Sequence, residues 1–170
     1  MKKEINIEKI RADAEKACKS GEFLCAEAVV HSIRQNIDPE MPKEFISAAT
    51  GFAVGVGGSG CMCAGVSGAV IALGYFFGRS FPTTVTDPQS QKTLAVSYEI
   101  QENFKEKNKI LCCNTLRKNK DIKDNGIPTE SNEKCIEFIG DMAAKAAEII
   151  SREFGWRIIR GGYKKGEKGN

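Results

Sequence analysis

The sequence lacks the close-spaced motifs by which most metal and haem sites are recognised. It has one histidine, His31, so a Cys2His2 zinc finger is excluded. It has no pair of cysteines separated by two residues, the spacing with which zinc sites usually begin. It also has no C-x-x-C-H motif, which excludes covalent attachment of haem c. Any centre formed by its cysteines must draw on segments that lie far apart in the chain.

The chain also has little net charge and no apolar signal-peptide core. Its 25 basic and 22 acidic side chains nearly cancel, so any basic patch must be local. Charges interrupt the segment Met1–Arg11, which argues against export. We interpret the glycine-rich and basic residues 155–170 as a flexible tail rather than a docking strip. We therefore expect a soluble cytoplasmic protein that does not bind nucleic acid.

One long uncharged stretch, residues 45–78, raises the question of a membrane span. It includes the glycine run GVGGSG at 55–60, which would break a helix inside the bilayer. The continuous apolar part, 61–77, lacks flanking basic clusters. We expect this part to form a buried central helix with no membrane span, and the glycine run to form a flexible loop.

Apolar residues recur at helical spacing along most of the chain. The expected helices cover residues 5–19, 22–37, 42–52 and 61–77, a segment with Leu94, Tyr98 and Phe104, and a last segment after an N-cap at Ser131. Strand signals are weak, with Ile158-Ile159 as the best candidate. The pattern predicts an all-α fold, a compact bundle of five to six helices around the glycine- and alanine-rich segment 61–77. We assign residues 1–154 to this domain.

Seven cysteines are more than a cytosolic protein usually has and fewer than a secreted disulfide scaffold has. In a reducing compartment such an excess favours metal, cluster or thiol chemistry. Several of them fall at expected helix starts, namely Cys25, Cys61, Cys63 and Cys135. Because a helix N-terminus carries partial positive charge, we expect these thiols to favour the thiolate form. The alternative is that they pack as small apolar side chains.

Several stretches of the chain form a recognisable pattern. They are Gly21–Val29 (GEFLCAEAV), the glycines of 51–60, Cys63–Val70 (CAGVSGAV), Cys113–Leu116 (CNTL) and Cys135–Ile139 (CIEFI). This pattern resembles the C_GCAxxG_C_C family of redox-active proteins, with a counterpart for each of its four cysteines. The resemblance implies that Cys25, Cys63, Cys113 and Cys135 are the functional cysteines. The same domain resembles the N-terminal part of split-Soret cytochromes, which implies a cysteine-ligated iron–sulfur site.

The chain departs from the family pattern at two places and adds three cysteines. Ala53-Val54 stand where glycine is usual, and Cys63-Ala64-Gly65 reverses the usual Gly-Ala order. The additional cysteines are Cys18, Cys61 and Cys112. Cys61 and Cys112 adjoin matched cysteines closely enough to replace them as ligands, whereas we expect serine at Cys18 to have little effect.

Three functions stay open for the four matched cysteines. The first is a [2Fe-2S] or [4Fe-4S] cluster for electron transfer or redox sensing, since such clusters usually take four thiolates. The second needs no metal: Cys25 or Cys135 attacks a disulfide and Cys63 resolves the intermediate. The third is a structural zinc site. A shared centre requires the four sulfur atoms to lie within about 7 Å of one another.

The remaining expectations concern partners. A redox partner protein is expected, while a homodimer and an oxidoreductase activity stay open. The run Gly55–Gly60 fits G-x-G-x-x-G, but no strand precedes it and no carboxylate follows about 20 residues later. We therefore interpret these glycines as close packing and not as a nucleotide-binding loop.

Overall fold

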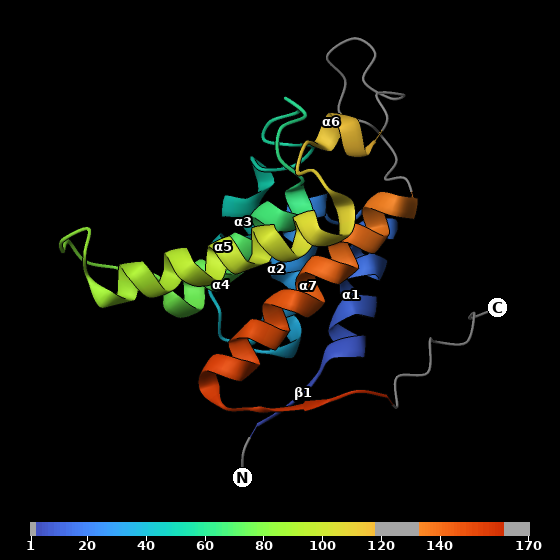
Figure 1. The fold of residues 1–170 in the computed structure, drawn as a ribbon. Coiled ribbons are helices and arrows are strands. Elements are labelled where there is room, and N and C mark those ends of the chain that lie inside the picture. Colours follow the sequence, from blue (N-terminus) through green and yellow to red (C-terminus); the bar gives the residue numbers. More distant parts are fainter. Residues whose placement is uncertain (1–2, 118–132, 162–170) are drawn as a thin grey trace.

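The computed structural model describes residues 3–117 and 133–161, which form a bundle of helices with a small sheet (Figure 1). The helices are α1 (Ile7–Lys19), α2 (Cys25–Asn36), α3 (Glu44–Thr50), α4 (Ala64–Phe77), α5 (Pro88–Asn108), α6 (Cys113–Leu116) and α7 (Glu133–Phe154). The strands are β1 (Glu4–Asn6) and β2 (Arg157–Ile159). The predicted all-α bundle is confirmed.

Helix α4 is the centre of the bundle, as its apolar sequence predicts. It packs against α2, α3, α5 and α7, and residues 64–69 are all buried. Two of its glycines lie at helix contacts. A Cβ at Gly68 would lie 2.6 Å from the carbonyl oxygen of Ala26 on α2, and a Cβ at Gly65 would lie 3.3 Å from that of Phe138 on α7. These small residues let the starts of α2, α4 and α7 approach closely.

The start of α2 is set by a carboxylate. Gly21 adopts a φ of +77° in the turn after α1. The Glu27 carboxylate then accepts a hydrogen bond from the backbone N–H of Leu24 at 2.8 Å, which satisfies a donor near the helix start. The helix therefore begins at Cys25, later than the predicted start at Glu22. Likewise, α4 begins at Ala64, so Cys61 precedes the helix.

The sheet joins the two ends of the described chain. β1 and β2 are parallel, with Ile5 opposite Ile158, and Ile5 is buried. The first predicted helix was wrong at residues 5–6, which form β1 because β2 supplies backbone partners from far along the chain. Residues 157–159 of the expected tail form β2 and are not a flexible segment. Residues 162–170 lie outside the described residues, so the tail stays a prediction there.

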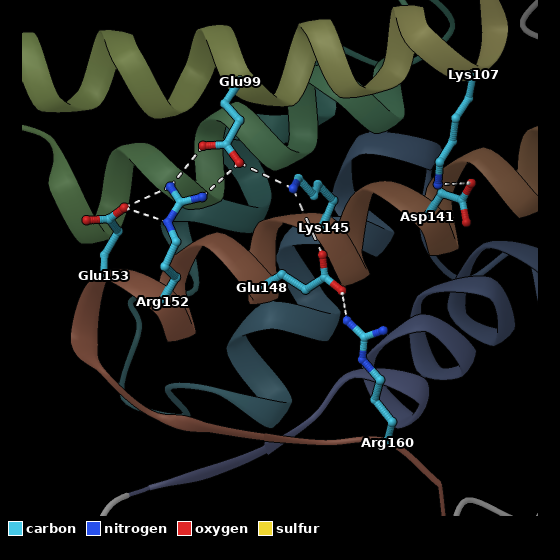
Figure 2. A network of polar contacts seen from close by, with 8 residues as sticks. All are labelled: Glu99, Lys107, Asp141, Lys145, Glu148, Arg152, Glu153 and Arg160. Carbon is cyan, nitrogen blue, oxygen red and sulfur yellow. Dashed lines mark hydrogen bonds and ion pairs between the residues drawn. The ribbon is translucent and has the colours of Figure 1, made fainter.

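Helix α5 packs on α4 and is joined to α7 by charged side chains (Figure 2). Its start is capped by Asp87, whose carboxylate accepts a hydrogen bond from the N–H of Ser90 at 2.8 Å. Arg152 donates two hydrogen bonds to the Glu99 carboxylate, at 2.9 and 2.8 Å. Lys145 lies 3.2 Å from the same carboxylate. These ion pairs bridge the two longest helices along their exposed sides.

Two further expectations concern the membrane and the last helix. Within the described ranges, no helix is long and apolar enough to cross a bilayer. The expected N-cap at Ser131 lies outside those ranges, as does most of the polar loop before it.

Candidate functional site

One cavity of about 450 Å³ brings the four matched cysteines together. They come from four different elements: Cys25 is the first residue of α2, Cys63 caps α4, Cys113 begins α6 and Cys135 lies in the first turn of α7. Figure 1 shows α6 at the end of the bundle opposite β1. Cys25 and Cys135 thus line the same cavity although they are 110 positions apart in the sequence.

The rest of the cavity wall is partly apolar and partly charged. Besides the four cysteines it includes Phe23, Val54, Ile136 and Ile139, together with Lys19, Arg117 and Glu133. Cys18 also lines the cavity, which its sequence position did not indicate. The available signal was the turn at Ser20-Gly21, which folds the end of α1 back beside the start of α2.

Cys63 is buried at the N-cap of α4. Burial raises the pKa of its thiol to about 12 from an ordinary value of 9.0. Backbone N–H groups of Gly65 and Val66 donate to the sulfur and lower this pKa only in part, while the nearby thiols of Cys113 and Cys25 raise it further. The sequence led us to expect a thiolate at this helix start, but the thiol is the favoured form in the absence of metal. The reason is that desolvation raises the pKa more than the hydrogen bonds and partial positive charge of the helix N-terminus lower it.

The thiol of Cys113 also has a raised pKa. Burial raises the pKa of its thiol to about 11, and the Cys135 and Cys25 thiols add to this shift. The guanidinium of Arg117 opposes it. These mutual effects indicate that the four thiols lie near enough to influence one another's charge.

Cys25 receives a backbone hydrogen bond from the glycine-rich loop. The N–H of Val54 donates to the Cys25 sulfur across 3.5 Å. To do so, Val54 adopts a φ of +53°, and Val56 follows with +57°. Positive φ is strained for β-branched residues, at a cost of about 1–3 kcal/mol each. The residue that stands where the family has glycine thus keeps a conformation that favours glycine.

Backbone hydrogen bonds join the two ends of the glycine-rich loop, and further bonds join the loop to the segment that carries Cys113. The N–H of Cys61 donates to the carbonyl of Gly55 at 3.1 Å, and a Cβ at Gly55 would lie 2.6 Å from that nitrogen. The N–H of Asn114 donates to the carbonyl of Gly60 at 3.0 Å, and the N–H of Cys63 to that of Leu111 at 2.7 Å. These contacts hold the segment that carries Cys63 and the segment that carries Cys113 against each other.

Cys61 and Cys112, the expected substitutes, lie beside the cavity. Neither is among the described residues of its wall. Cys61 is exposed, and the Cys112 sulfur lies 3.5 Å from the Gly60 carbonyl oxygen. The hydroxyl and N–H of Thr115 lower the pKa of the Cys112 thiol. Within residues 3–117 and 133–161, no group of three or more histidine, cysteine or acidic side chains is arranged to hold a metal ion.

Comparison with known proteins gives one match. A family model described as "Putative redox-active protein (C_GCAxxG_C_C)" matches residues 23–149, which include Cys25, Cys63, Cys113 and Cys135 but not Cys18. No curated protein and no solved structure matches the chain.

Proposed function

The chain belongs to the C_GCAxxG_C_C family of redox-active proteins, and from this premise we propose that it holds an iron–sulfur cluster through Cys25, Cys63, Cys113 and Cys135. The cluster would serve electron transfer or redox sensing with a partner protein in the cytoplasm. One observation carries the proposal: four elements, far apart in the sequence, each place one cysteine on the wall of the same cavity.

The donor set is the one that such a cluster takes. Four thiols are the usual ligands of [2Fe-2S] and [4Fe-4S] clusters. The four cysteines lie on the wall of a cavity of about 450 Å³ that other residues also line. A structural zinc site would draw the same four sulfurs to about 2.3 Å from one point. When bound, the cluster accepts and releases one electron.

The residues around the sulfurs have defined roles in this proposal. The N–H of Val54 hydrogen-bonds the Cys25 sulfur, and those of Gly65 and Val66 hydrogen-bond the Cys63 sulfur. Such donors favour thiolates and shift the reduction potential upward. The cations of Lys19 and Arg117 in the wall offset negative charge, while Phe23, Ile136 and Ile139 limit access of water.

Loading releases protons. Because burial raises the pKa of Cys63 to about 12 and of Cys113 to about 11, both thiols are protonated at neutral pH before ligation. Ligation requires thiolates, so affinity rises with pH.

A second candidate function uses thiols that line the same cavity. Without a cluster, Cys25 or Cys135 attacks a disulfide of a partner protein and Cys63 resolves the mixed disulfide. The partner is thereby reduced to two thiols while the chain gains an internal disulfide.

The deciding experiment is anaerobic purification and reconstitution with ferrous iron and sulfide, followed by absorption spectra and iron and sulfide assays. We expect a visible chromophore that is lost in Cys25→Ser, Cys63→Ser, Cys113→Ser and Cys135→Ser. The matched controls Cys61→Ser and Cys112→Ser alter cysteines beside the cavity and should retain the chromophore. A variant that keeps its full iron and sulfide excludes the substituted cysteine as a ligand. For Cys63 and Cys113 this conclusion also requires a double variant, because Cys61 or Cys112 can replace its neighbour. If the double variant loses iron and sulfide, the neighbour has taken over as the ligand. Zinc in place of iron, or a disulfide without metal, supports the other candidates.

A further inference from the structure

We propose that Cys61 and Cys112 form a second redox site, a dithiol at the rim of the cavity that exchanges with small-molecule disulfides. Both cysteines are additional to the four that the family pattern contains. Cys61 is exposed, and Cys112 is half-buried. Neither is among the described residues that line the cavity, so the exchange does not depend on a cluster there.

Backbone contacts bring the two residues together. The N–H of Cys63 donates to the Leu111 carbonyl at 2.7 Å, and the N–H of Asn114 donates to the Gly60 carbonyl at 3.0 Å. These two contacts place residues 60–63 beside residues 111–114. Cys61 and Cys112 therefore lie on two adjacent segments.

The Gly60 carbonyl oxygen sets an upper limit on their separation. The Cys112 sulfur lies 3.5 Å from this oxygen. The oxygen belongs to the planar peptide that joins Gly60 to Cys61, and it therefore lies about 3 Å from the Cys61 Cα. The Cys112 sulfur is consequently no more than about 6 to 7 Å from that Cα, and rotation of both side chains brings the two sulfurs toward the distance of a disulfide.

The chemistry is a two-step exchange. The sulfur of one cysteine attacks the small disulfide, whose S–S bond breaks to release one small thiol and leave a mixed disulfide on the chain. The other cysteine attacks the mixed disulfide and releases the second small thiol. The pair is oxidised by two electrons, the small disulfide is reduced, and both hydrogens end on the released thiols.

The disulfide between Cys61 and Cys112 has a structural consequence. It joins the residue after Gly60 to the residue before Cys113, so it covalently links the segments that carry Cys63 and Cys113. Oxidation at the rim thereby holds two walls of the cavity in their docked arrangement, without using any thiol of the cavity.

The test uses the full chain, reduced and metal-free, treated with oxidised glutathione and then with an alkylating reagent in acid. Met62 lies between Cys61 and Cys63, so cyanogen bromide separates these two cysteines. Combined with trypsin, it leaves Cys61 on fragment 44–62, while Cys112 and Cys113 remain on fragment 110–117. We expect these two fragments to be joined, with a loss of two hydrogens from the mass of the intact chain.

Two surface variants assign the bond within those fragments. Cys61→Ser and Cys112→Ser should each lose the cross-link completely and retain one glutathione adduct on the remaining partner. A cross-link that persists in Cys112→Ser shows that Cys113 is used instead and overturns the proposal. A bond within fragment 110–117, a bond from 63–79 to 110–117, or no bond at all overturns it as well. None of these outcomes depends on whether iron binds in the cavity.

Discussion

The two faces of this bundle hold their segments together by different means. At the cavity end, the segment with Cys113 is docked on a loop of glycines by backbone hydrogen bonds, and two valines of that loop have positive φ. Along α5 and α7, the contacts are ion pairs between long, partly exposed side chains (Figure 2). An added Cβ at Gly55 or Gly60 would overlap neighbouring atoms, whereas flexible charged side chains can rearrange. The cavity should therefore be much more sensitive to small substitutions than the charged face.

The largest effect is expected at the contact between α2 and α4. In Gly68→Ala the new Cβ would lie 2.6 Å from the Ala26 carbonyl oxygen, so the helices that carry Cys25 and Cys63 must separate. We expect the free energy of unfolding to fall by about 2–3 kcal/mol in urea titration. Gly74→Ala on the same helix is the matched control, because nothing lies within 4 Å of its Cβ. It should gain up to about 1 kcal/mol, and equal losses in both variants would falsify the close-packing argument.

Gly60→Ala should be next in size. Gly60 has a φ of +77°, and a Cβ there would lie 2.1 Å from the Asn114 side chain, which must move away. We expect a loss of about 2 kcal/mol together with weaker iron retention, because α6 is displaced. Gly57→Ala shares the positive φ but has nothing within 4 Å, so it isolates the backbone strain at about 1 kcal/mol. If iron retention falls equally in both, docking on Gly60 does not position Cys113.

The buried thiols predict a pH dependence in the metal-free protein. The pKa of Cys63 is about 12 when folded and near 9 when unfolded, so between these values the folded state binds more protons. Stability is therefore full below pH 9 and falls as pH rises, by about 1 kcal/mol per pH unit for this thiol. Thermal unfolding from pH 8 to 10 should show a smaller decline in Cys63→Ser. Parallel curves for the two proteins would contradict the burial of this thiol.

The smallest effect is expected on the charged face. Arg152→Ala removes two hydrogen bonds to Glu99, but both side chains are partly exposed and screened by salt. We expect a loss of about 0.5 kcal/mol that diminishes in high salt, with unchanged iron content. Arg152 also lowers the pKa of Glu99 by hydrogen bonding, so the contribution of this pair fades as pH falls through the range where Glu99 is protonated. A loss of iron in Arg152→Ala would show that the two faces are coupled.

The helices could be predicted where the spacing of apolar residues determines the local structure. The prediction failed where backbone partners from far along the chain determine it. The buried residues of α7, including Phe138, Ile139 and Met142, follow directly from periodicity. β1 could not be predicted, because its partner strand lies at the other end of the described chain. Nor could the positive φ of Val54, since local preference opposes it and only the closed loop enforces it.

The same distinction applies to the cavity. Family resemblance named four cysteines, and the structure places them around one space with Cys18 beside them. The expected thiolate character of Cys63 failed, because a helix start is visible in sequence whereas the depth of burial is not.

The central claim is that Cys25, Cys63, Cys113 and Cys135 ligate one cluster, and its most direct test is alkylation of each cysteine in reconstituted and metal-free protein under reducing anaerobic conditions. Quantitative peptide mass spectrometry reports the ratio of the two labelling rates for every thiol. We predict that reconstitution strongly slows labelling of these four and leaves Cys61 and Cys112 unchanged. Protection of only two of the four, or protection of Cys61 or Cys112 in place of a neighbour, would contradict the assignment.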